Sequence, residues 1–216
     1  MLCIIQPYFL PFIGYFQLIN KCDVAVIFDD VKFQKKGYSV KTKYDDKISI
    51  SINIQNRNKQ ELIYQKKISK EYYFNIQKLK KSILQKSPIF FDELLFDELF
   101  FLPEDRSYFN FIFKQIKIIC NKLKINTKIL KSSEVIDTTH LIKQEKIFAI
   151  CKTLNKKKYL NSIGGKKLYE ENEFLRNGIN LNFFNYNPYL SGKYNDNSIL
   201  NLIFNFKIDD IIKSLE

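Results

Sequence analysis

The chain has 216 residues, 45% of them hydrophobic, and a formal net charge of +12 from 35 Lys and Arg against 23 Asp and Glu. This length suits one domain with a substantial core, and no apolar run approaches the roughly 18 to 20 residues of a membrane span. Only three of the basic residues are Arg, the side chain with which proteins read duplex DNA, so we expect no sequence-specific DNA binding, while loose attraction to anionic ligands stays open.

The first third of the chain predicts strands joined by a helix. Residues 2–5 form a short apolar strand, which no basic segment precedes, so we expect no signal peptide and a cytoplasmic protein. Helical spacing over 13–22 leads to a continuous apolar strand at 24–28, a pattern typical of a strand covered on both faces. Residues 47–54 alternate between Ile and polar side chains and predict a strand with one wet face, with which 62–68 is a candidate to pair.

The middle third is predominantly helical in its periodicity. Apolar residues at helical spacing predict helices over 70–86, 90–101 and 107–124, the last of them the longest and most buried. The first of these ends at a Ser-Pro pair, because the residue before proline disfavours helix. A short strand is expected at 127–130.

The last third returns to alternating helices and strands. Helices are predicted over 142–154 and 198–215, with strands at 158–160 and 179–184. A short helix precedes the last strand and ends at Gly178, which suits a C-capping position.

This order predicts an α/β fold: a Rossmann-like, three-layer, mostly parallel sheet with a helical insertion in the middle third. We expect residues 1–216 to form a single α/β domain, with a mainly helical segment at about 70–125. In open sheets of this class, ligands bind beyond the carboxyl ends of the strands. Polar residues that follow predicted strands are therefore the candidate site.

The first such segment follows the first strand and contains two prolines that stiffen it. Gln6, Tyr8 and Tyr15 each carry a polar tip there, which favours a role in binding over simple packing. Gly14 allows either a positive φ or a close backbone approach. The helix that begins here also offers free N–H groups to an anion.

The second segment begins with Asp29 and Asp30, which directly follow a buried strand. Carboxylates are costly to bury without partners, and adjacent side chains on a strand point in opposite directions. One of the pair is a candidate base, metal ligand or hydroxyl acceptor, while the other caps a turn; the alternative, of equal weight, is that both serve as turn and cap residues. Lys36 and Tyr38 lie just beyond, where a lysine can neutralise a phosphate or carboxylate.

The third segment is Asn161 to Lys166, in which Gly164 and Gly165 precede Lys166. Two glycines and a lysine after a strand can form an anion-holding turn, although the Walker A spacing is absent. A plain tight turn is the alternative.

His140 is the only histidine, which excludes a multi-histidine metal site and leaves one candidate imidazole base. It precedes a predicted helix at whose start Gln144 is a candidate binding residue; a lone histidine is more often structural. The four cysteines form no Cys-x-x-Cys pair and are predicted to be buried free thiols. We expect no metal site and no cofactor.

At these residues the chain resembles the WbqC-like family, bacterial proteins often encoded with surface-polysaccharide genes. The matching motifs are Gln6-Pro7-Tyr8 with Pro11 and Gly14-Tyr15-Phe16, then Asp29-Asp30-Val31, Lys36-Gly37-Tyr38, Gln144-Glu145, and Asn161 with Ile163-Gly164-Gly165-Lys166 and Leu168-Tyr169. Two departures stand out. After Tyr38 the family's arginine is missing, and near the end a family carboxylate is replaced by Asn201.

The resemblance implies a transferase of bacterial surface-glycan biosynthesis, and we interpret the reaction as acyl or aminoacyl transfer to a nucleotide-linked amino sugar. The donor would be an acyl or aminoacyl compound, with aminoacyl-tRNA one candidate. Tyr15, a candidate catalytic residue, would orient the substrate together with its neighbours. Asp29 or Asp30 would take a proton, and Lys36 with the Gly164-Gly165-Lys166 turn would hold negative charge.

Three other functions compete with this interpretation. The strand, Pro-x-x-Gly-Tyr turn and helix resemble the layout of HIGH-motif nucleotidyltransferases, but both histidines of that motif are missing, which disfavours their chemistry. A non-catalytic nucleotide-sugar-binding or scaffold protein fits an amide, phenol and lysine site equally well. A hydrolase is less favoured, because the chain has no Gly-x-Ser-x-Gly motif or metal cluster.

Overall fold

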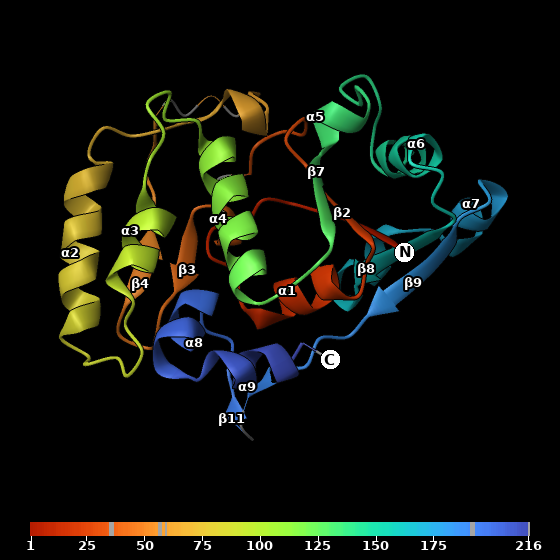
Figure 1. Cartoon of the computed structure of the whole chain (residues 1–216). Coiled ribbons are helices and arrows are strands. Elements are labelled where there is room, and N and C mark those ends of the chain that lie inside the picture. Colours follow the sequence, from red (N-terminus) through yellow and green to blue (C-terminus); the bar gives the residue numbers. More distant parts are fainter. Residues whose placement is uncertain (35–36, 56–57, 59, 191–192, 216) are drawn as a thin grey trace.

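The computed structural model describes residues 1–34, 37–55, 58, 60–190 and 193–215. At its centre lies a five-stranded, all-parallel sheet in the order β7-β2-β1-β8-β9 (Figure 1). The strands are β1 (Leu2–Ile5), β2 (Val24–Ile27), β7 (Lys128–Lys131), β8 (Lys158–Ser162) and β9 (Asn180–Phe184). This arrangement confirms the predicted Rossmann-like α/β fold.

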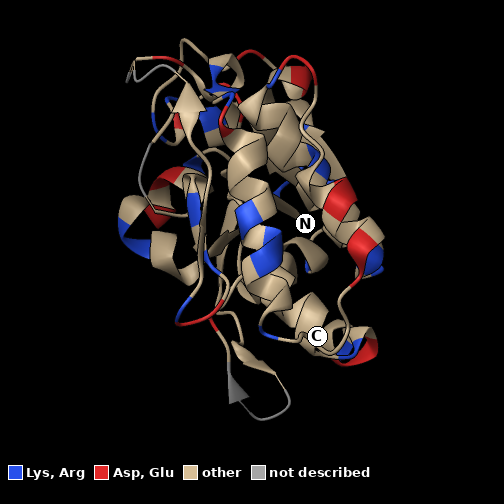
Figure 2. Ribbon diagram, turned by 90° about the vertical axis from the view of Figure 1, so that its left-hand side faces the viewer, with Lys and Arg blue, Asp and Glu red and all other residues tan. Residues whose placement is uncertain are grey.

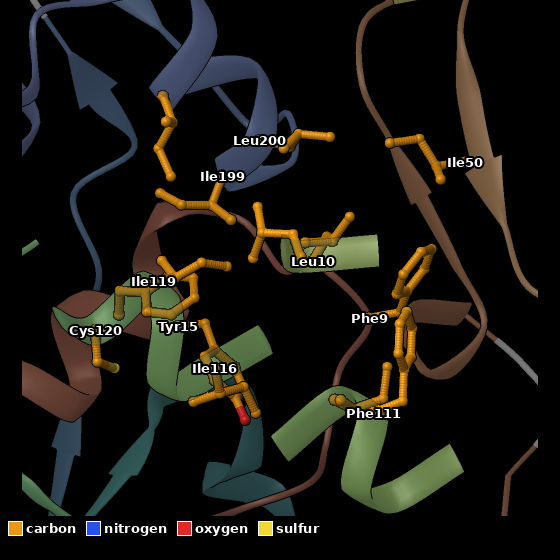
Figure 3. Close-up of a cluster of buried hydrophobic side chains, with 14 of the residues drawn as sticks. Phe9, Leu10, Tyr15, Ile50, Phe111, Ile116, Ile119, Cys120, Ile199 and Leu200 are labelled. Atoms are coloured by element: carbon orange, nitrogen blue, oxygen red, sulfur yellow. The ribbon is translucent and has the colours of Figure 1, made fainter. Parts of the chain in front are cut away.

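Helices cover both faces of the sheet, so the fold has three layers. Side chains alternate along β1, where Cys3 belongs to one hydrophobic core while Leu2 and Ile4 belong to the other. The first core includes α1 (Ile13–Asn20), α4 (Tyr108–Lys122) and α8 (Ile199–Asn205), and Figure 3 shows how their side chains meet. The second core includes α6 (Glu145–Thr153) and α7 (Glu171–Arg176).

In the described part of the insertion between β2 and β7 lie two small antiparallel pairs and, besides α4, two further α-helices. The pairs are β3 (Lys41–Lys43) with β4 (Ser49–Ser51) and β5 (Ile54–Gln55) with β6 (Lys67–Ile68). The helices α2 (Tyr72–Leu84) and α3 (Glu93–Phe100) precede α4. The strand predicted over 47–54 is therefore divided into β4 and β5, which pair with different partners.

Several short elements escaped prediction because they carry no periodic signal. They are α5 (Ser132–Val135), directly after β7, and the hairpin of β10 (Tyr189–Leu190) and β11 (Lys193–Tyr194). The helix predicted over 198–215 is two helices, α8 and α9 (Ile208–Lys213), because Phe206 between them is extended. Gly178 follows α7 with φ +71°, as its C-capping prediction requires.

All four cysteines are buried and free, as predicted. Burial raises the pKa of Cys120 and of Cys151 to about 12, so both thiols are protonated at neutral pH and act as packing groups. Within the described ranges, no helix has both the length and the apolar character that crossing a membrane requires.

Candidate functional site

The order of the sheet strands reverses between β1 and β8. From β1 the chain adds β2 and then β7 on one side of the sheet, and afterwards it adds β8 and β9 on the other side. Such a reversal is the position at which open α/β sheets bind ligands. Pairing of these two strands is limited to Leu2 with Tyr159, whereas β1 and β2 pair over four residues. The carboxyl end of β1 is therefore free of β8 where the first candidate segment begins.

Hydrogen bonds from distant parts of the chain fix the backbone of residues 6–11. The bonds join Tyr15 Oη to Gln6 O (2.9 Å), Tyr108 Oη to Pro7 O (3.1 Å), Phe9 N to Tyr38 O (2.8 Å), Ser198 Oγ to Leu10 O (2.8 Å) and Ile199 N to Pro11 O (2.8 Å). Two prolines restrict the same segment further. Its side chains are therefore presented from a rigid backbone.

Five aromatic side chains, Tyr8, Phe12, Tyr15, Tyr38 and Tyr186, meet around this segment, and we call them the aromatic cluster. Ring centroids lie 5.8 Å apart for Tyr8–Tyr15, 5.6 Å for Tyr8–Tyr38, 6.1 Å for Phe12–Tyr38 and 4.8 Å for Phe12–Tyr186. Tyr15 is buried, Tyr38 is 49% exposed and the other three are half-buried. The cluster therefore offers ring faces and edges to solvent.

Some polar side-chain groups at this site have hydrogen-bonding partners within the protein, and others have none among the described residues. The Tyr15 hydroxyl is committed to the Gln6 carbonyl, so this predicted catalytic residue holds the segment in place. Among the described residues, the hydroxyls of Tyr8 and Tyr38 and the side-chain amide of Gln6 have no hydrogen-bonding partner. Burial, with the neighbouring Tyr38, raises the pKa of Tyr8, so its phenol keeps its proton at neutral pH and can donate a hydrogen bond.

Gly14 serves close approach, one of its two predicted roles. A Cβ on this residue would lie 2.4 Å from the Phe12 ring and 2.7 Å from Tyr186. One turn later, Gln17 Nε2 donates to the carbonyl oxygens of Asn187 (2.8 Å) and Ser214 (2.6 Å), while its Oε1 accepts from Asn187 N (3.0 Å). Together they hold the segment after β9 against α1.

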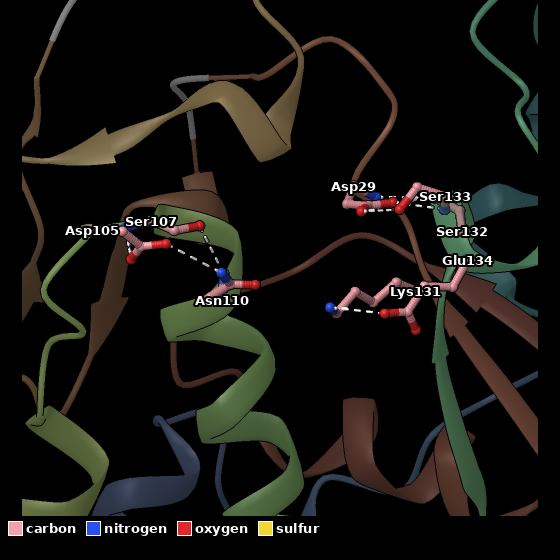
Figure 4. Close-up of polar contacts among 8 residues, drawn as sticks. All are labelled: Asp29, Asp105, Ser107, Asn110, Lys131, Ser132, Ser133 and Glu134. Carbon is pink, nitrogen blue, oxygen red and sulfur yellow. Dashed lines mark hydrogen bonds and ion pairs between the residues drawn. The ribbon is translucent and has the colours of Figure 1, made fainter.

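Asp29, at the end of β2, is only 3% exposed, and both of its carboxylate oxygens have partners. Oδ1 lies 2.8 Å from Ser132 Oγ and accepts from Ser133 N at 2.9 Å, while Oδ2 accepts from Ser133 Oγ at 2.6 Å (Figure 4). These donors belong to the first residues of α5. The carboxylate thus satisfies the start of the short helix that the sequence did not predict.

Asp30 is equally buried, at 2% exposure. Its Oδ1 lies 2.5 Å from Ser132 Oγ, and its Oδ2 accepts from Thr138 N (3.3 Å) and Thr138 Oγ1 (2.5 Å). Rossmann sites often keep an acidic residue near the end of the second strand for the ribose hydroxyls. Here the carboxylates at that position are occupied by the chain itself, which favours the turn-and-cap alternative.

The turn after β8 is a 3₁₀ helix over Ile163–Leu168. Asn161 lies over Gly165, where an added Cβ would be 2.4 Å from the amide nitrogen of Asn161. Asn161 Oδ1 accepts from Ser162 N at 2.9 Å. Gly165 therefore makes room for the Asn161 side chain, whereas Gly164 is exposed with open space around its Cα.

The remaining predicted residues are not drawn into the aromatic cluster by any described contact. His140 is exposed in the turn before α6 and makes no hydrogen bond within the described residues. Gln144 is half-buried at the N-cap position just before α6, where its side chain does not cap the helix. Lys166 is exposed, with its Nζ 6.0 Å from the Phe183 ring centroid. Lys36 lies outside the described residues.

These elements extend over nearly the whole chain, and so does a match to one sequence family. The profile of the WbqC-like protein family matches residues 6–212. The chain belongs to this family. Membership indicates a role in bacterial surface-polysaccharide biosynthesis. No curated protein and no solved structure matches the chain.

In this WbqC-like protein, the residues that complete the site lie far from the signature segment. Tyr108 on α4 donates to the carbonyls of Pro7 and Ser39, and Tyr186 reaches the cluster from the segment after β9. Each is one of 13 tyrosines, and neither has a local motif. Only Gln17, a polar residue on the buried face of a predicted helix, carried a signal that sequence reasoning could have used.

No described residues form a group of three or more His, Cys, Asp or Glu side chains suited to a metal ion. The donors at the site are phenols and amides, which bind organic hydroxyl and carbonyl groups by hydrogen bonding. The arrangement suits recognition of a ring-bearing, hydroxyl-rich ligand.

Proposed function

We propose that this WbqC-like protein is a transferase of surface-glycan biosynthesis that binds a nucleotide-linked amino sugar beyond the end of β1. The observation that carries the proposal is the rigid segment at residues 6–11, which presents the Gln6 amide and the Tyr8 phenol, with the Tyr38 phenol packed beside Tyr8; none of these groups has a hydrogen-bonding partner among the described residues. Ring faces of the aromatic cluster suit the flat faces of a base or a sugar, and the free polar tips suit its hydroxyl groups.

The reaction we propose is acyl or aminoacyl transfer. The sugar amine nitrogen attacks the carbonyl carbon of a thioester or an ester such as aminoacyl-tRNA. The new C–N bond forms as the C–S or C–O bond breaks. The amine loses a proton and the leaving thiolate or alkoxide gains one, so charge and atoms balance. A protonated phenol such as Tyr8 can donate a hydrogen bond to the oxygen on which negative charge develops.

In this scheme Asp29 or Asp30 takes the proton of the amine. Either carboxylate would first have to give up a hydrogen bond from Ser133 or Thr138. Activity of Asp29→Asn and Asp30→Asn therefore tests the base directly. Full turnover in both variants would remove the two carboxylates from the mechanism.

Isothermal titration with UDP-N-acetylglucosamine and a dTDP-linked amino sugar tests binding. We expect Tyr38→Ala and Gln6→Leu each to weaken binding about tenfold, since each removes stacking or a hydrogen bond worth about 1–1.5 kcal/mol. Tyr73→Ala is the matched control, because Tyr73 is similarly exposed but lies on α2. Equal affinity in all three variants would contradict the site.

A second function, a non-catalytic nucleotide-sugar-binding protein of the glycan assembly machinery, is favoured by the occupied carboxylates of Asp29 and Asp30. Incubating the protein, a bound nucleotide sugar and a panel of acyl thioesters and aminoacyl-tRNAs separates the two. A mass increase of the sugar supports transfer. Binding without modification by any donor supports the second function. Mass analysis of the surface glycan from a strain lacking the gene would identify a missing substituent.

A further inference from the structure

A second feature, independent of the strand-end site, is an unpaired strand edge in the insertion. β4 pairs with β3 along one edge, in the register Thr42 with Ile50. The flanking bonds, Ile52 N to Val40 O (2.9 Å) and Tyr44 N to Ile48 O (2.9 Å), place residues 48, 50 and 52 in the hydrogen-bonded positions. In an antiparallel pair the alternate residues direct their backbone groups outward.

The outward groups of β4 are therefore the N–H and C=O of Ser49 and Ser51. The same geometry holds on the opposite edge of the pair, where Lys43 O points outward and accepts from Ser198 N at 2.7 Å. For Ser49 and Ser51, no such partner exists among the described residues. Four backbone hydrogen-bonding groups thus remain available at an edge.

The same edge is already used for strand pairing a few residues further along. Asn53 O accepts from Ser69 N at 2.8 Å, and β5 pairs with β6 in the register Gln55 with Lys67. Beyond Ser69 the chain turns away to begin α2. The strand that begins with β6 therefore ends before it reaches Ser49 and Ser51, although the edge to which it pairs extends past both residues.

A groove of about 400 Å³ occupies that position, between β4 and α2. Its lining includes Ser49 and Ser51 on one side and Asn75, Ile76, Lys78 and Leu79 of α2 on the other. Ile50, Ile76 and Leu79 are buried beneath it, at 2%, 6% and 8% exposure. The groove thus combines an open backbone edge and an apolar floor, and Lys78 is the one charged side chain among the described residues that line it.

We propose that this groove binds an extended peptide segment of a partner protein as an added strand. The segment lies antiparallel to β4, continues the line of β6, and exchanges backbone hydrogen bonds with Ser49 and Ser51. Alternate side chains face the apolar floor, so they are small and apolar, and an acidic residue next to Lys78 completes the match.

The residues that line the groove favour an extended peptide over a sugar and over a second copy of the chain. Among the described residues no aromatic ring lines the groove, so a stacked sugar lacks its platform. A second copy of the chain would have to bring its own edge strand past α2, which walls the groove. A single extended chain meets neither obstacle.

Amide NMR titration with synthetic eight-residue peptides tests the proposal. The probe alternates Val and Thr with one Asp, and the matched peptide carries N-methyl groups at alternate residues, which remove its donors on one edge. We expect the probe to shift the amide signals of Ser49 and Ser51 and to slow their hydrogen exchange at least tenfold, and the N-methylated peptide to bind at least tenfold more weakly.

Ser51→Pro removes one outward donor without touching the bonds to β3, and should weaken the probe at least tenfold. Lys41→Pro is the control, because Lys41 is the cross-strand partner of Ser51 and lies on the opposite edge of the β3–β4 pair. It measures the effect of a proline on the stability of the hairpin itself. Binding that is insensitive to Ser51→Pro, or no binding by the peptide panel, would overturn the proposal. So would shifts at Ser49 and Ser51 caused by an oligosaccharide, or a concentration-dependent dimer that Ser51→Pro abolishes.

Discussion

Asp29 and Asp30 owe their burial to donors that come from a different strand end. Ser132, Ser133 and Thr138 all follow β7, more than 100 residues further along the chain. A pair of carboxylates after a strand predicts a polar site, but it does not reveal whether a ligand or the chain supplies the donors. The sequence could name the two residues, and only tertiary structure supplies their partners.

Asp29→Asn should destabilise the protein by about 2–4 kcal/mol. The substitution removes a buried carboxylate oxygen that accepts hydrogen bonds and turns an amide N–H toward the Ser133 hydroxyl. Ser133→Ala, which removes only one donor, should cost about 1 kcal/mol. Urea unfolding of both variants gives the two values. A stable Asp29→Asn protein with lost turnover would instead assign the carboxylate to the chemistry.

The two glycine positions 14 and 164 should respond oppositely to alanine. Gly14→Ala brings a Cβ within 2.7 Å of Tyr186 and should cost about 1–3 kcal/mol and displace that ring from the aromatic cluster. Gly164→Ala meets nothing closer than 4.0 Å and should change stability by less than about 0.5 kcal/mol. Thermal unfolding compares them; equal losses would show that close approach is not what Gly14 provides.

At the scale of elements, the sheet strands and the longer helices could be predicted because their side chains repeat with a clear period. The errors have physical causes. The Ile alternation over 47–54 continues across a change of pairing partner, since β4 and β5 use opposite edges of one extended segment. The four residues of α5 are too few for a period, and their start is stabilised by Asp29 rather than by a local cap.

Charge also organises neighbouring elements. Lys80 of α2 pairs with Glu93 and Asp97 of α3, each at 2.8 Å, and Figure 2 shows acidic residues of α3 beside basic residues of α2. The acidic partners are largely exposed, so each pair contributes less than about 1 kcal/mol.

One hydroxyl joins three elements near the site. Tyr108→Phe removes the donor to Pro7 O and Ser39 O, and should cost about 1–3 kcal/mol and weaken nucleotide-sugar binding by loosening residues 6–11. Tyr72→Phe is the matched control, because that buried hydroxyl donates to Phe100 O away from the segment. It should lose stability alone, as measured by urea unfolding and titration calorimetry. A parallel loss of affinity in both variants would contradict the positioning role.

At the scale of the whole molecule, the buried thiols predict that the folded protein loses stability at alkaline pH. The pKa of Cys120 and of Cys151 is about 12 in the folded protein against an ordinary value of 9.0. Their contribution to stability is complete below pH 9 and is lost as pH rises toward 12, at up to about 1.4 kcal/mol per group per pH unit. Urea midpoints should stay level to about pH 9 and fall above it. Cys151→Ala should flatten the fall, and a level profile to pH 11 would contradict it.

The candidate site as a whole was only partly predictable. The segment at residues 6–16 is contiguous, so its motif could be recognised directly. Tyr108, Tyr186 and Ser198 reach it from α4, from the exit of β9 and from the start of α8. Lone tyrosine and serine residues carry no pattern, so their arrival depends on the order of strands in the sheet.

The single amide of Gln17 binds residues 187 and 214, which lie 170 and 197 positions away. This has a consequence for synthesis on the ribosome. The signature segment is translated before Tyr186, Ser198 and the partners of Gln17. A nascent chain that has been translated as far as β8 therefore contains the family motif but not the later residues that hold it in place. Competence to bind should therefore appear abruptly, and only after residue 214 has left the ribosome.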